Sequence, residues 1–302
     1  MIFCFLVFSY QADYNFKFVS YVGLMSLTHH GGAIYYESST CSSFFCESCL
    51  FYQCGTRNGY YGGAIYISNG NNGTVSFKKV CASECNSIGG ENRYQFCFLT
   101  AYSMVDSTHS YVSVTKCTTT ISENHYSWVI WNMKASCTNM NISDNRNYWV
   151  STMSICLDNN PGSLSYSNFV NNAGSYICFS LEISQDYSLT YTNVIGNNSP
   201  QGEGVVRMRN LKNRMQYCCF KNNNNIVFCL VSANVEVRDC YILESSTSGS
   251  TIQFLSPTSN PSPLKLILFA SAHCQAAHPL IESSFRYINE YQKIVFITYL
   301  LV

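Results

Sequence analysis

Gly-Gly-Ala-Ile-Tyr-Tyr occupies residues 31–36, and Gly-Gly-Ala-Ile-Tyr-Ile occupies residues 62–67, 31 positions later. A second motif, an apolar residue followed three positions later by Asn, recurs at steps of 21, 27, 25 and 26 residues. Its asparagines are Asn124, Asn145, Asn172, Asn197 and Asn223. Cys54 and Cys85 lie in a similar context, 31 residues apart. Recurrence at these periods indicates a repeat protein whose units are completed by stacking on their neighbours.

Each repeat contains a Gly or polar turn and two or three short strands, and no window shows helical periodicity over more than two turns. Units of this length are too short for propeller blades and lack the frame of a leucine-rich repeat. The sequence therefore predicts an all-β, right-handed parallel β-helix, a single-stranded solenoid of about nine coils of 20–30 residues. The longer step from Cys85 to Asn124 predicts an insertion around residues 107–111.

The repeated Gly and Asn residues suit the corners of such coils. Gly31, Gly32, Gly62 and Gly63 supply positive φ or close backbone approach at one corner. The motif asparagines suit a second corner, because an Asn side chain hydrogen-bonds backbone groups and tolerates left-handed φ. We expect both sets to be structural repeat residues.

The composition excludes several classes of protein. Lys and Arg balance Asp and Glu at 17 each, and only 11% of residues are charged, whereas hydrophobic residues make up 47%. A polyanion-binding protein needs a basic surplus, so a nucleic-acid partner is not expected. A disordered chain needs low hydrophobicity and high net charge. Neutral stacking residues suit a solenoid, because like charges on adjacent strands would repel.

The two ends of the chain are apolar. Residues 1–25 are expected to form an N-terminal apolar segment, either a signal peptide or a first strand. A signal peptide usually has a positive residue before its apolar core, and no Lys or Arg precedes the run at 2–8. The β-helix is expected over 26–285, followed by an apolar tail at 286–302. The tail's apolar run, at 294–302, is too short to span a bilayer. Membrane association is therefore expected only through the terminal segments.

The Gly-Gly-Ala-Ile copies at 31–34 and 62–65, with Phe169–Asn172 and Phe220–Asn223, resemble the repeats of chlamydial polymorphic outer membrane proteins. The chain also resembles Cys- and Asn-rich surface proteins of protists such as trichomonads. The resemblance covers about residues 26–285. It implies a right-handed parallel β-helix in an extracellular or cell-surface setting, with an adhesive role. The two motifs never share a unit here.

One acidic pair is a candidate for catalysis. Glu123 and Asp144 each lie two residues after the apolar residue of a motif, so they are expected to stack in adjacent coils. Glycoside hydrolysis uses two carboxylates about 5–10 Å apart. Asn171 and Gly196 take this slot in the next two units, so the acidic file does not continue. The sequence therefore favours the interpretation that Glu123 and Asp144 are solvated corner residues over the interpretation that they are the catalytic pair of a polysaccharide lyase or hydrolase.

The 17 cysteines allow several interpretations. Cys46, Cys49, Cys81 and Cys85 have a zinc-like spacing, but a three-residue step on a strand points two side chains to opposite faces. Disulfides between coils and buried unpaired thiols both remain open. No cofactor or metal site is predicted. Among the Asn-x-Ser/Thr sequons, Asn72 lies in a turn and is the best glycan candidate.

These observations favour a non-enzymatic cell-surface or secreted repeat protein that presents a neutral face to a host or environmental protein or glycan. Two alternatives remain: a carbohydrate-active β-helix enzyme, and a fragment of a longer surface protein. The fragment is considered because clear polar end units, which a stacked core needs for solubility, are not evident.

Overall fold

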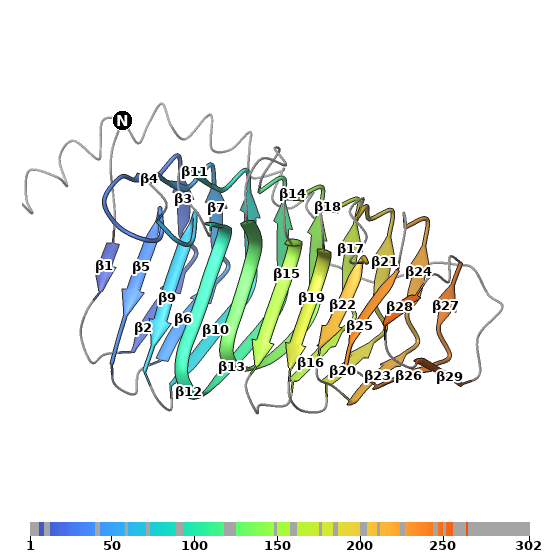
Figure 1. Ribbon diagram of the computed structural model, residues 1–302. Helices are drawn as coiled ribbons and strands as arrows, with labels where there is room; N and C mark the ends of the chain where they lie inside the picture. Colours follow the sequence, from blue (N-terminus) through green and yellow to red (C-terminus); the bar gives the residue numbers. More distant parts are fainter. Residues whose placement is uncertain are drawn as a thin grey trace, which may run out of the picture.

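The computed structural model describes residues 6–8, 13–39, 43–57, 60–70, 73–88, 93–117, 125–147, 150–157, 162–174, 177–183, 187–199, 204–209, 212–223, 227–232, 234–243, 247–249, 252–255 and 264. Over these residues the protein contains β-strands and no helix, and neighbouring coils pair in parallel along one axis (Figure 1). The predicted all-β parallel β-helix is confirmed.

Three walls of parallel strands form the solenoid, and each described coil except the last adds one strand or strand segment to each wall. The first wall contains β1 (Leu6–Phe8), β5 (Ile34–Glu37), β9 (Ile65–Asn69), the first part of β12 (Arg93–Thr115), the first part of β13 (His125–Ser143), β15 (Val150–Leu157), β19 (Ile177–Ile183), β22 (Val206–Arg209), β25 (Phe228–Val231) and β28 (Thr247–Gly249).

The second wall lies along the lower side of the solenoid in Figure 1. It contains β2 (Tyr14–Lys17), β6 (Ser43–Glu47), the first part of β10 (Thr74–Ser83), the middle of β12 and β13, β16 (Gly162–Ser165), β20 (Tyr187–Thr190), β23 (Lys212–Gln216), β26 (Asn234–Arg238) and β29 (Ile252–Leu255).

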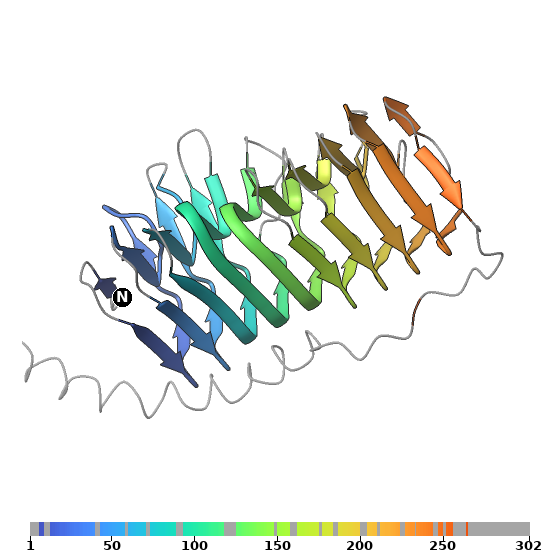
Figure 2. The same ribbon diagram turned by 90° about the horizontal axis from the view of Figure 1, so that it is seen from below.

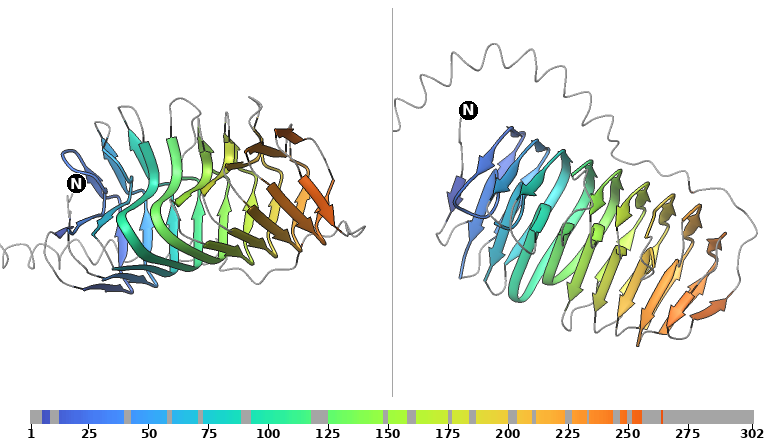
Figure 3. Two further views of the ribbon diagram at one scale, coloured as in Figure 1. Left: turned by 60° about the horizontal axis from the view of Figure 1, so that its bottom comes forward. Right: turned by 45° about the horizontal axis from the view of Figure 1, so that its top comes forward.

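The third wall contains β3 (Ser20–Val22), β7 (Leu50–Tyr52), the ends of β10, β12 and β13, β17 (Asn168–Val170), β21 (Asn193–Ile195), β24 (Cys219–Lys221) and β27 (Tyr241–Ile242). Two short sets follow it: β4 (Met25–Ser26), β8 (Gly55–Arg57) and β11 (Asn86–Ile88) in one, β14 (Arg146–Asn147) and β18 (Ala173–Gly174) in the other. Figures 2 and 3 show strands of successive coils lying side by side.

The strand pairing refines the expected coil boundaries. Ten strands pair in succession in the described part of the first wall, a number slightly different from the nine coils expected. Strands β2, β3 and β4 pair with β6, β7 and β8, so the solenoid extends N-terminal of residue 26. Residues 107–111 do not form the expected insertion, because β12 pairs there with both β10 and β13.

Single residues with positive φ turn the chain from the second wall into the third. Lys79, Tyr111 and Asn139 have φ values of 55°, 56° and 52°. Each interrupts an otherwise extended strand, so β10, β12 and β13 bend without a separate loop. A left-handed φ is unfavourable for residues other than Gly, Asn and Asp. Most coils nevertheless have a residue with this conformation at this corner.

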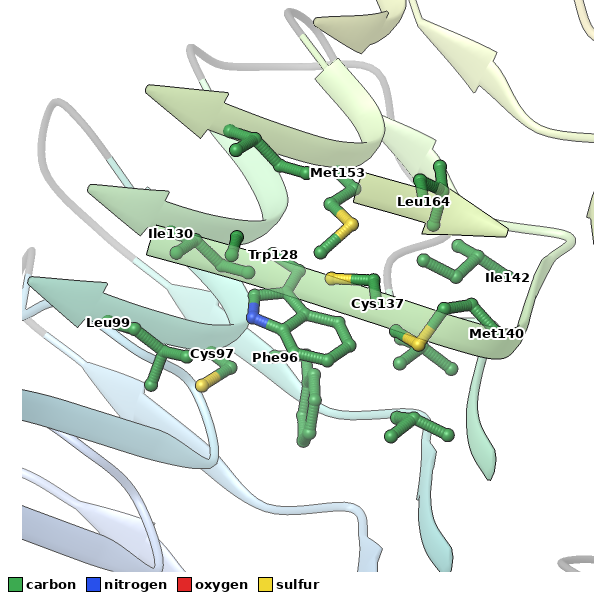
Figure 4. Packing of buried hydrophobic residues seen from close by; sticks show 14 of the residues in the cluster. Phe96, Cys97, Leu99, Trp128, Ile130, Cys137, Met140, Ile142, Met153 and Leu164 are labelled. Carbon is green, nitrogen blue, oxygen red and sulfur yellow. The ribbon is translucent and has the colours of Figure 1, made fainter. Parts of the chain in front are cut away.

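The interior of the solenoid is filled by side chains. Alternate residues of each strand point inward, and they form one continuous buried apolar cluster from Tyr21 to Cys240. Figure 4 shows Trp128 within this cluster, beside Phe96. The two rings meet edge to face with centroids 5.6 Å apart. Within the described ranges, no helix has the length and apolar character that a membrane crossing requires.

Candidate functional site

Four motif asparagines form a column of buried amides at the corner after the third wall. Each Nδ2 donates to the carbonyl of the motif's apolar residue in the preceding coil: Asn145 to Val114 (3.1 Å), Asn172 to Ile142 (2.9 Å), Asn197 to Phe169 (2.8 Å) and Asn223 to Val194 (2.9 Å). Each of the first three also donates to Oδ1 of the next Asn, at 3.0–3.2 Å. The column thus joins adjacent coils by two kinds of hydrogen bond.

Cysteines continue the same column toward the N-terminus. The Cys54 thiol donates to the carbonyl of Tyr21 (3.3 Å), and the Cys85 thiol donates to that of Phe51 (3.5 Å). Both carbonyls belong to the third-wall residue of the preceding coil, which is the position that the asparagines contact. A thiol at this corner therefore performs the same bonding role as an amide, more weakly.

The register assigns a different residue to the level before Asn145. Val114 pairs with Ile142 and Thr115 pairs with Ser143. Cys117 therefore precedes Asn145 in the column, and Lys116 is the residue beside Asp144. Glu123 and Asn124 lie outside the described residues. The expected equivalence of Glu123 with Asp144 is corrected, because the true step to Ile142 is from Val114, not from Ile121.

The repeated glycines lie where backbones approach closely. Gly31 and Gly62 have φ of 66° and 67°. A Cβ on Gly32 would overlap the carbonyl oxygen atoms of Gly55 and Gly63, and one on Gly63 would overlap that of Gln95. The first Gly of each pair is thus required because its φ is positive, and the second is required because there is no space for a Cβ.

The remaining polar candidates have definite places. Asn72 lies outside the described residues, whereas Asn197 is buried and hydrogen-bonded. Eleven described cysteines are free, and all except Cys229 are buried. Cys81 is disulfide-bonded. Among the described residues, no group of three His, Cys, Asp or Glu side chains is arranged to hold a metal ion.

Three tyrosines stack on the outside of the corner between the second and third walls. The ring centroids of Tyr166 and Tyr191 are 4.8 Å apart with planes 1° apart, and Tyr191 and Tyr217 are also 4.8 Å apart, at 20°. All three have positive φ, between 47° and 55°. Desolvation, with a smaller effect of the two neighbouring phenols, raises the pKa of Tyr191. We call these residues the tyrosine ladder.

Two files of hydroxyl side chains run beside the tyrosine ladder on the outer face of the second wall. Strand register aligns them across successive coils. The first file is Ser76, Thr108, Ser136, Ser163 and Ser188. The second file is Ser110, Thr138, Ser165 and Thr190. All nine side chains are exposed or half-buried. We call the two files and the tyrosine ladder together the hydroxyl–tyrosine face.

Hydrogen bonds between coils align these hydroxyls. Thr108 Oγ1 donates to Ser76 Oγ (3.1 Å), Ser165 Oγ donates to Thr138 Oγ1 (3.3 Å), and Ser136 Oγ lies 3.3 Å from Ser163 Oγ. Each hydroxyl has one donor and two acceptor positions. These contacts use only part of that capacity, so the files retain groups that can bond to a ligand.

Charged residues lie at the ends of the hydroxyl files. Glu47 accepts ion pairs from Lys17 (3.3 Å) and Lys78 (3.1 Å) on the N-terminal side. Arg238 pairs with Glu236 (3.3 Å) on the C-terminal side. No charged residue lies in either file between Lys78 and Arg214. On the same outer face, two residues before Thr108 and Ser136, Asp106 and Lys134 form an ion pair (3.6 Å), so the face between these ends carries no net charge.

The hydroxyl files were not predicted from the sequence, although their spacing is regular. Their members lie four and six residues before the motif's apolar residue: Thr138 and Ser136 precede Ile142, and Ser165 and Ser163 precede Phe169. Alignment of the repeats on the apolar residue would have found them.

No family model matches the chain, and no curated protein or solved structure matches it.

Proposed function

We propose that this protein is a non-enzymatic cell-surface or secreted β-helix protein that binds a ligand through the hydroxyl–tyrosine face. One observation carries the proposal. Nine outward hydroxyls and three stacked tyrosines lie side by side on a parallel sheet, in files that contain no charged residue. Tyrosine is favoured at binding surfaces because it combines apolar area with a polar group.

The surroundings of Asp144 support a binding role over a catalytic one. Hydrolysis of a glycosidic bond uses two carboxyl groups in proximity, whereas Asp144 is flanked along its corner by Lys116 and Asn171.

Two measurements test the proposed function. Antibody raised against the purified protein should stain intact, unpermeabilised cells of the source organism or detect the protein in their medium. Binding to cell-surface preparations should be saturable and should weaken when the tyrosine ladder is changed. Staining only after permeabilisation, together with no saturable binding, would contradict the proposal.

A further inference from the structure

The hydroxyl files have the dimensions of a regular lattice. Parallel strands lie about 4.8 Å apart, and residues two apart on a strand are separated by about 6.6 Å. Ser163 and Ser165 therefore repeat the pattern of Ser136 and Thr138 one coil farther along the axis. The inter-coil hydrogen bonds hold these positions before any ligand arrives, which lowers the entropic cost of binding.

From this arrangement we infer that the face binds an extended, uncharged β-linked glycan whose chain lies parallel to the solenoid axis, with one sugar residue per coil. The inference rests on the proposed function and names its ligand class. In an extended β-1,4-linked chain, neighbouring sugars are spaced by about the length of one ring, which is close to the spacing of the coils. Because successive sugars face opposite ways, every second sugar would meet an equivalent hydroxyl pair.

The charge distribution selects a neutral ligand. The hydroxyl files carry no charge over the levels from Ser110 to Thr190. The cations Lys17 and Lys78 are already paired with Glu47, Lys134 is paired with Asp106, and Arg238 is paired with Glu236. An anionic polymer would find no line of free cations along the face. A neutral polyhydroxyl chain can exchange hydrogen bonds with it at each level.

The tyrosine ladder would form the edge of this site. Its members follow directly after the second hydroxyl file, since Tyr166 comes after Ser165 and Tyr191 comes after Thr190. Tyr166 is 46% exposed and Tyr217 is 38% exposed, so these rings are accessible beside the files. They add hydrogen-bonding groups and apolar area along one side of the glycan chain.

The test measures binding of cellohexaose and N-acetylchitohexaose to the full chain by isothermal titration calorimetry. Maltohexaose serves as the α-linked control and hyaluronan as the charged control. Ser136→Arg should weaken binding of the β-linked hexasaccharide at least about tenfold, because the long Arg side chain would cover the neighbouring hydroxyl groups of the files. The fold accepts Arg in this file, since Arg214 occupies a later level.

Two further variants complete the test. Ser20→Arg, on an exposed residue of β3 in the third wall, should leave binding unchanged. Tyr166→Asn should weaken binding about 3- to 10-fold through the loss of ring contact. It should fold normally, because Asn139 occupies the preceding level of that corner with positive φ. Circular dichroism and the urea midpoint verify the fold of each variant.

The outcomes separate this inference from the proposed function. Preference for β-linked neutral chains, lost in Ser136→Arg and kept in Ser20→Arg, supports the inference. Equal binding of maltohexaose, binding of hyaluronan alone, or undiminished binding by Ser136→Arg overturns it. If no glycan binds while intact cells are stained and a protein ligand binds saturably, the inference fails and the proposed function stands.

Discussion

The backbone N–H of Cys117 donates to Oδ1 of Asn145 across 2.8 Å. This hydrogen bond joins the cysteine half of the corner column to the asparagine half. On one side, Cys54 and Cys85 bond through thiols, and on the other, Asn145 and its successors bond through amides. This corner position therefore requires a small side chain that can donate a hydrogen bond. The asparagine half of the column is the more stable half, because its amides also hydrogen-bond to each other.

Asn172 should be a major contributor to stability. Its side chain donates to Ile142 O and Asn197 Oδ1, and its Oδ1 accepts both the backbone N–H (3.1 Å) and Nδ2 (3.2 Å) of Asn145. We expect Asn172→Ala to reduce the free energy of unfolding by about 2–5 kcal/mol, because buried groups lose their partners. Urea unfolding measures the change.

The adjacent residue provides a control for this experiment. Asn171 is exposed and has φ of 55°, so Asn171→Gly should change stability by less than about 1 kcal/mol, since Gly adopts this conformation without strain. Equal losses in Asn172→Ala and Asn171→Gly would show that the amide column does not stabilise the fold.

An isosteric pair at Cys117 tests what the column requires. Cys117→Asn should remain within about 1 kcal/mol of the wild type, because its amide can donate to Asn145 Oδ1 as the later asparagines do. Cys117→Asp has almost the same shape but brings a carboxylate beside that oxygen atom in a buried site. We expect it to lose about 3 kcal/mol or more. Thermal denaturation at pH 7 compares the two, and equal melting temperatures would refute the donor requirement.

The fold could be predicted from the sequence because the corner residues have little freedom. A buried polar side chain must find partners and a crowded glycine admits no Cβ, so the positions of Asn172 and Gly63 accept few residue types and recur visibly. Where the requirement is looser, prediction failed. Cys117 can replace Asn in the column, and the pattern at Ile121 and Asn124 arose in an Asn-rich chain without occupying the level before Asn145.

The hydroxyl–tyrosine face was not predicted for a related reason. An outward-facing Ser or Thr is compatible with many strand surfaces, so Ser136 or Thr138 alone carries no signal. Their meaning depends on register, and the register was displaced by the error at Asn124. Once Val114 is taken as the apolar residue of its repeat, Ser110 aligns with Thr138.

The space beside Gly63 gives a steric prediction. A Cβ there would overlap the carbonyl oxygen atoms of Gln95 and Asn86, which belong to backbone in or beside neighbouring strands. Gly63→Ala should therefore cost more than about 3 kcal/mol or prevent folding. Gly23→Ala is the matched control, because Gly23 has φ of 64° with no neighbouring atoms within 4 Å of the added Cβ. Its cost should be about 1–2 kcal/mol.

Soluble yield and the urea midpoint distinguish these two effects. A Gly63→Ala protein as stable as Gly23→Ala would mean that the coils can separate to admit a methyl group. The Gly-Gly-Ala-Ile motif would then reflect conformational preference alone.

His109 makes the stability of the core dependent on pH. It is fully enclosed in the second wall, beside the rings of Phe77 and Trp128, and its Nε2 lies 2.6 Å from Ser107 Oγ. Burial lowers its pKa to about 3. Because an unfolded His has a pKa of about 6.5, the unfolded state binds the additional proton between these values. Stability is therefore retained above pH 6.5 and falls as the pH decreases toward 3.

We expect His109→Leu to flatten this dependence in urea unfolding between pH 4 and 7, at the cost of a partner for Ser107 at neutral pH. A smaller slope should remain, since burial also lowers the pKa of His30. Cys137→Val alters the next residue of the same inward column and adds no group that titrates in this range. It should shift stability equally at every pH. If His109→Leu kept the full wild-type slope, the acid sensitivity would have to arise from groups other than His109.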